Sequence, residues 1–134
     1  MTDSKVYRVR KEYYNPSTGK WDIREQIVSS PIQKADTATG AGADLDVLTY
    51  TVTTGKNLYI YKLGLNGGDD KTWKIIYGTT VLDYIAGEAG KQYSAVSTPT
   101  APLYVIPGGQ TVKIQCINAT ASTAYNASFA GVEM

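Results

Sequence analysis

The chain of 134 residues is the size of about one domain, and its composition already excludes several protein classes. Lys+Arg 13 against Asp+Glu 12 leaves a net charge of +1, so no overall positive field favours nucleic acid or an anionic membrane. Histidine is absent and cysteine occurs once, which excludes a histidine-dependent triad, an internal disulfide and a cysteine-cluster zinc site. No apolar run is long enough to span a membrane and the start is charged, so we expect cytoplasmic synthesis and no membrane partner.

The first 30 residues are predicted to form a β-hairpin arm. Residues 5–14 and 20–28 flank an Asn-Pro-Ser-Thr-Gly turn. Pairing Tyr14 with Lys20 gathers the apolar residues on one face. Because an isolated hairpin is marginally stable, we expect this face to dock on the chain's own sandwich or on a neighbouring subunit. The expected interface residues of the arm are Tyr7, Val9, Tyr13, Trp21, Ile23 and Ile27.

Residues 31–45 are small, polar and glycine-containing, which is typical of a flexible linker. The remaining segment, 46–134, has β-branched and aromatic runs separated by turn residues. We therefore expect an all-β chain: a β-sandwich or jelly roll of about seven to eight strands at 46–134 that carries the arm. The predicted strands are 46–54, 57–65, 72–77, 81–86, 92–96, 103–106, 111–117 and 124–134.

Alternation within these strands predicts which side chains face the core. In 57–65, Leu58 and Ile60 are expected on one face, with Leu63 among the residues on the other. In 111–117, Cys116 follows the inward side of the alternation, so it is interpreted as a buried core residue and not as a reactive thiol.

The sequence gives little support for a catalytic or metal-binding site. The loop carboxylates Asp44, Asp46, Asp69 and Asp70 could contribute to a calcium site, but they lack EF-hand spacing and are typical of solvated turns. A glycosidase pair would need two facing carboxylates, and nothing distinguishes Asp83 and Glu88 from ordinary surface charges. We expect no catalytic residue, no cofactor and no metal.

Tyrosine accounts for 11 of the aromatic residues, against 2 tryptophans and 1 phenylalanine. Tyrosine suits the core and rim of a sandwich, a subunit interface or a platform that stacks on sugar rings, and the sequence leaves these alternatives open. The candidate interface residues of the body are Tyr59, Tyr61 and Phe129. The candidate glycan-binding residues are Trp73, Tyr77 and Tyr84.

Three segments resemble a known family. Residues 48–60 (LTYTVTTGKNLYI) look like the opening strand pair of small jelly-roll proteins of tailed bacterial and archaeal viruses. Residues 103–112 (LYVIPGGQTV) are similar to the Pro-Gly hairpin of these proteins, and 127–134 (ASFAGVEM) resemble their closing strand. The resemblance implies a virion surface component such as a capsid-decorating protein, a head fibre or a tail accessory. Such proteins are commonly trimers, and some hold neighbours with a terminal arm.

The expected function is therefore structural and not enzymatic. The chain is expected to self-associate, most simply as a trimer, and to clasp neighbours with its arm on the virion surface after assembly in the host cytoplasm. Its expected partners are further copies of itself and the major capsid protein or another virion protein, without nucleic acid. The alternative is a carbohydrate- or receptor-binding β-sandwich module.

Overall fold

The computed structural model describes residues 7–15, 20–28 and 32–134, with side chains from residue 32 onward. No helix occurs in these ranges, so none of the described segments could cross a membrane as a helix. The all-β class is thereby confirmed. The strands are β1 (Tyr7–Asn15), β2 (Lys20–Val28), β3 (Ile32–Thr39), β4 (Leu45–Thr51), β5 (Leu58–Gly67), β6 (Lys71–Tyr77), β7 (Thr80–Gly87), β8 (Tyr93–Val96), β9 (Tyr104–Ile106), β10 (Thr111–Cys116) and β11 (Ala124–Glu133).

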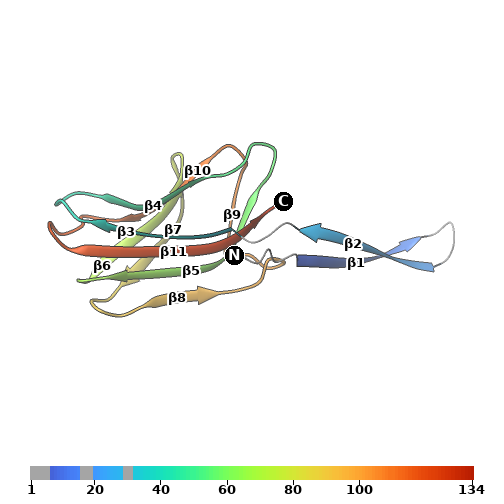
Figure 1. The fold of residues 1–134 in the computed structure, drawn as a ribbon, viewed down its shortest axis with the longest axis horizontal. Coiled ribbons are helices and arrows are strands. Elements are labelled where there is room, and N and C mark those ends of the chain that lie inside the picture. The colour runs from blue at the N-terminus through green and yellow to red at the C-terminus, as the bar shows by residue number, and fades with distance from the viewer. Residues whose placement is uncertain (1–6, 16–19, 29–31) are drawn as a thin grey trace, which may run out of the picture.

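Strands β3 to β11 form two antiparallel sheets that pack together as a β-sandwich (Figure 1). One sheet has the order β4-β10-β6-β7, and the other has the order β3-β11-β5-β8, with the short β9 also paired to β5. Each strand predicted within 46–134 is found, with ends shifted by a few residues. The prediction works because alternating β-branched residues between glycine-rich turns are a strong local signal for strands.

The core lies between the two sheets and is filled from both sides. In β10 the predicted alternation is confirmed, because Val112, Ile114 and Cys116 are buried while their neighbours along the strand are only partly so. Trp73 of β6 and Tyr125 of β11 meet edge to face across the core, with ring centroids 6.0 Å apart. Edge-to-face packing adds to the stabilisation that burial of these large rings provides.

The alternation predicted for β5 is wrong beyond its middle. The pairing of β5 with β11 passes from Ala130↔Lys62 directly to Gly131↔Ile60, so β5 holds one residue more than β11 at this point. An extra residue in one strand is a β-bulge, and it reverses the facing of every residue that follows. Leu63 is consequently buried in the same core as Leu58, and not on the opposite face.

The linker expected over 31–45 is also wrong for most of its length. Residues 32–39 form β3, which pairs antiparallel with β11 from Ala124↔Thr39 to Gly131↔Ile32. The loop that follows is anchored as well, because Gly40 N–H donates to Thr123 O over 2.9 Å and Gly42 N–H donates to Ala119 O over 2.9 Å. The sandwich therefore begins at residue 32, and β3 adds one strand to the expected seven or eight.

Candidate assembly surface

The predicted arm is a hairpin with a sheet of its own. Strands β1 and β2 pair antiparallel along their full length, and neither pairs with a strand of the two body sheets. In Figure 1 the hairpin projects beyond the sandwich, at the end where β11 finishes. The hairpin itself is thus confirmed, while its proposed docking on a neighbour stays a prediction.

The register of this hairpin differs by one residue from the predicted one. Lys20 pairs with Asn15 and not with Tyr14, whose partner is Trp21. The connection therefore has four residues, 16–19, instead of the expected five. Loop length sets the register of a hairpin, so a one-residue error changes every cross-strand pair.

The single apolar face predicted for the arm depends on the register that is not observed. In the structure Tyr13 pairs with Asp22, and Ile23 pairs with Glu12. Directly opposed residues share one face of an antiparallel pair, so the predicted apolar residues do not all share one face. The residues to which this correction applies are Tyr7, Val9, Tyr13, Trp21, Ile23 and Ile27.

Of the three residues of the body that were expected at a subunit interface, two are partly accessible. Tyr59 and Tyr61 are half-buried. Phe129 has 3% of its surface exposed and packs edge to face against Tyr50, with ring centroids 5.8 Å apart. Phe129 is thus a core residue of this chain, and its assignment to a subunit interface is wrong.

The predicted glycan platform is not assembled. Trp73 is 2% exposed, because it faces the core in line with Ile75, and a buried indole ring cannot stack on a sugar. Tyr77 is half-buried, whereas Tyr84 of β7 is 61% exposed. One exposed ring remains of the three that were expected to act together.

The edge strand β3 is the most accessible regular strand of the body. Its central residues are exposed, and it pairs with β11 on one side only. Its register with β11 contains no shift, so β3 is straight enough to accept a further strand. Figure 1 shows β3 and β11 side by side along the sandwich.

The outer face of the same sheet is hollowed. A shallow hollow of about 410 Å³ is lined by residues of β3, β5 and β11 with Gln92, among them Ala35, Gly64 and Ser128. A second hollow of about 270 Å³ adjoins it and shares Ala35 and Ser128. Small side chains make up much of the lining of the first hollow, so another chain could approach the sheet backbone closely there.

Tyr50 and Glu133 tie the two sheets together near β3. The Tyr50 hydroxyl donates to Glu133 Oε1 over 2.5 Å, and Thr53 N–H donates to the same oxygen over 3.1 Å. Burial, together with the carboxylate of Glu133, raises the pKa of Tyr50 to about 12. Burial alone would raise the pKa of Glu133, but the hydrogen bonds from Thr53 and Tyr50 outweigh it and lower that pKa. Lys34 of β3 lies over the Tyr50 ring, 5.7 Å from its centroid.

A second tie closes the opposite side of the sandwich. The Tyr104 hydroxyl of β9 donates to Asp83 Oδ2 of β7 over 2.7 Å. Burial, followed by the hydrogen bond and charge of Asp83, raises the pKa of Tyr104. Asp83 thus has a structural partner within the sandwich, and Glu88 instead forms an exposed ion pair with Lys91 at 2.7 Å.

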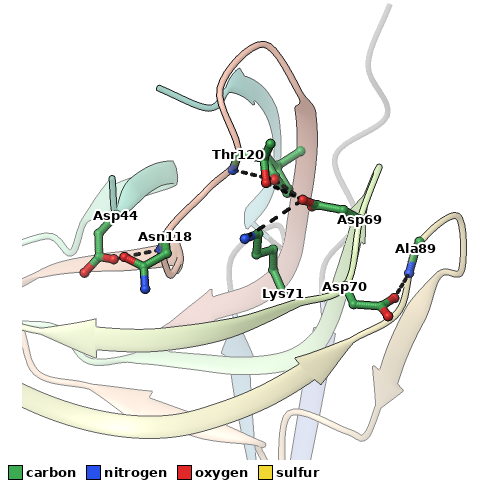
Figure 2. A network of polar contacts seen from close by, with 8 residues as sticks. Asp44, Asp69, Asp70, Lys71, Ala89, Asn118 and Thr120 are labelled. Carbon is green, nitrogen blue, oxygen red and sulfur yellow. Dashed lines mark hydrogen bonds and ion pairs between the residues drawn. The ribbon is translucent and has the colours of Figure 1, made fainter. Parts of the chain in front are cut away.

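The loop carboxylates hold the loops of one end together (Figure 2). Asp69 accepts hydrogen bonds from the hydroxyls of Thr120 and Tyr125, and Thr120 N–H donates to the Tyr125 oxygen over 2.9 Å. These hydrogen bonds, that of Thr120 first, lower the pKa of Asp69.

The neighbouring carboxylates have similar roles in Figure 2. Asp44 Oδ1 accepts from Asn118 N–H over 2.9 Å, and Asp70 Oδ1 accepts from Ala89 N–H over 2.7 Å. Within the described part of the chain, no group of three or more carboxylate and cysteine side chains is arranged to hold a metal ion. The acidic residues of these loops therefore serve as hydrogen-bond acceptors for turns.

Cys116 lies in the core with no exposed surface, as its alternation predicted. Burial, and to a smaller degree the charge of Asp69, raises its pKa to about 11. A buried thiol with a raised pKa is a poor nucleophile.

No family model matches this chain, and neither the curated proteins nor the solved structures contain a significant match to it.

Proposed function

We propose that this chain is a structural assembly protein of the capsid-decorating or capsid-stabilising type, which self-associates on a virion surface and binds neighbours through its β1–β2 hairpin. Its partners in this proposal are further copies of itself, a trimer being the expected assembly, and the major capsid protein or another virion protein. The virion assignment comes from the sequence resemblance of 48–60, 103–112 and 127–134.

The observation that carries the assembly role is the separation of the hairpin from the sandwich. The buried core extends from Val47 to Val132, and the described strands of the body complete two packed sheets without β1 or β2. A two-stranded hairpin is at best marginally stable by itself in water. A hairpin that pairs with no described strand of the body, and that is marginally stable alone, gains most from binding to another molecule.

The deletion of residues 1–30 tests this role. We expect the shortened chain to keep a cooperative unfolding transition while its mass, measured by light scattering after size exclusion, falls from an oligomer to a monomer. A full chain that is monomeric at every concentration would contradict the proposal. So would a shortened chain that assembles as the full one does.

The virion assignment needs a separate experiment. Electron cryo-microscopy of the native particle should place the density of this sandwich on the outer shell, with the hairpin in contact with a neighbour. Particles that lack the protein throughout their shell and tail would overturn this part and leave the self-association untouched.

The carbohydrate-binding alternative has less support, because burial of Trp73 leaves Tyr84 as the one strongly exposed ring of the predicted platform.

A further inference from the structure

We propose that β2 of one copy adds to the open edge of β3 in a second copy, in antiparallel orientation. This inference rests on the proposed self-association and assigns the site that receives the hairpin. Addition of a strand to an exposed sheet edge supplies main-chain hydrogen bonds that are independent of a side-chain pocket.

The backbone of β3 has one side occupied and one side open. Gly40 N–H and C=O both bond toward the 122–123 turn, over 2.9 and 3.0 Å, so this even-numbered position faces β11. On the far side of β11, Ala124 C=O accepts from Gly68 N–H over 3.3 Å, which agrees with the same alternation. Successive residues of a strand point their backbone groups in opposite directions. Gln33, Ala35, Thr37 and Thr39 therefore aim their backbone groups at the open edge.

One donor on this edge already has a local partner. Thr37 N–H donates to the carboxylate of Asp36 over 2.8 Å. If this N–H faced β11, it would instead donate to a carbonyl of that strand. This hydrogen bond supports the assignment of the odd residues to the open edge. The Asp36 carboxylate also acts as a cap that an incoming strand would displace.

The other edges of the sandwich are poorer acceptors. The pairing of β4 with β10 and the pairing of β7 with β6 each contain a register shift. Strands β8 and β9 have 4 and 3 residues, against 8 in β3. Bulges and short strands are features that protect sheet edges from additional strands, and β3 has neither.

The occupant follows from the connection between β2 and β3. Strand β2 ends at Val28 and β3 begins at Ile32, so three residues separate them. A three-residue turn between antiparallel strands normally needs a left-handed residue at its third position, which would be Pro31. Proline cannot adopt that conformation, and it biases the residue before it toward extended backbone. Closure of β2 onto β3 of the same chain is thereby disfavoured, while the same strands remain free to pair between copies.

We take the register in which β2 and β3 are paired directly from their adjacent ends. This register also places opposite charges across from each other. With Val28 opposite Ile32, Arg24 is opposite Asp36, and Gln26 is opposite Lys34. Opposite charges on directly opposed residues stabilise an antiparallel pair. Within one copy β2 pairs with β1 and not with β3, and exchange between copies would form the missing contact, as in other strand exchanges.

Substitution at Ala35 tests the acceptor edge in the full-length chain. Ala35→Pro removes an N–H that faces the open edge and not β11, so the sandwich can tolerate it, but an incoming strand loses a donor and meets the proline ring. Ala35→Ser keeps the N–H and is the matched control. We expect Ala35→Pro to be a monomer in light scattering and Ala35→Ser to assemble as the unmodified chain does.

A covalent test does not depend on the tolerance of β3 for proline. Arg24→Cys and Asp36→Cys are made in separate full-length chains and mixed under mild oxidation. The proposed register makes these positions a non-hydrogen-bonded pair, whose Cα separation of about 4.5 Å allows a disulfide. We expect a disulfide-linked heterodimer from this mixture. Arg24→Cys mixed with Thr49→Cys, on the exposed face of β4, is the control and should give little of it.

The outcomes separate the two proposals. If the unmodified chain is monomeric throughout, the proposed self-association fails and this inference fails with it. If the unmodified chain assembles, but folded Ala35→Pro assembles equally well and the Asp36→Cys mixture crosslinks no better than the Thr49→Cys mixture, self-association stands and the β3 edge is rejected as its site.

Discussion

Tyr50 makes the stability of the sandwich sensitive to alkaline pH. In the folded chain its pKa is raised from 10.0 to about 12, through burial and the neighbouring Glu133. The unfolded chain releases this proton near pH 10, so the stabilisation is complete below pH 10 and is lost as pH rises toward 12. We expect the difference in free energy of unfolding between the unmodified chain and Tyr50→Phe to shrink over this range, as measured by urea unfolding at each pH.

Glu133→Gln gives the matching control. The amide still offers Tyr50 an acceptor but carries no charge, so the pKa of Tyr50 should fall toward its ordinary value and the alkaline loss should become smaller. The pKa of Glu133 itself is lowered, so its own contribution is present above its ordinary pKa and is lost as pH falls. Alkaline unfolding curves of identical shape in the unmodified and Glu133→Gln chains would contradict the role assigned to this tie.

At the scale of single elements, the sequence is most informative where a strand has one buried and one exposed face. The strand 111–117 was predicted with its inward side chains because Val112, Ile114 and Cys116 alternate with polar residues. The same signal was present for Trp73, which shares the parity of Ile75 in β6, and it correctly indicates burial of both side chains. Strand parity is therefore a better guide to the position of Trp73 than its aromatic character, which suits a core as well as a glycan platform.

Strand β3 could not be predicted in this way. Its residues Ile32 to Thr39 show no apolar alternation, because most of them are exposed on both sides of an edge strand. What fixes them as a strand is pairing with β11, about 90 residues later in the chain, and local composition carries no record of such a distant partner. The predicted hairpin register is wrong for a smaller reason: the connection between β1 and β2 is one residue shorter than expected, and this shifts every cross-strand pair.

The turn after β3 depends on a glycine. A Cβ added to Gly40 would lie 2.2 Å from Thr120 O, a backbone atom that cannot move aside cheaply. We expect Gly40→Ala to reduce the free energy of unfolding by about 1–3 kcal/mol, in the range of other overpacked sites, as measured by urea unfolding. The neighbouring exposed Ala41→Ser should have little effect. Equal stabilities for the two variants would show that the 40–44 loop is not seated on the 117–123 turn.

For the whole molecule, the direction of strand exchange determines the assembly. The hairpin of each copy donates and the β3 edge of each copy accepts, so the contact joins two different surfaces. A contact of this kind closes into a ring when the rotation between copies allows it and otherwise extends into a filament. A trimeric ring satisfies every hairpin and every β3 edge, which agrees with the assembly expected for the proposed function.

An assembly of this kind also couples stability to concentration. Since unfolding of a chain releases its hairpin from a neighbour, a tenfold rise in protein concentration should stabilise each chain in a trimer by about 1 kcal/mol and raise Tm by about 3–5 °C. Ala35→Pro removes the contact between copies and leaves the sandwich, so its Tm should not change with concentration. Calorimetry of both chains over a hundredfold range of concentration measures the difference. Parallel rises in the two chains would mean that copies associate through a surface other than the β3 edge, and a flat response in both would mean that the folded sandwich is stable without a neighbour.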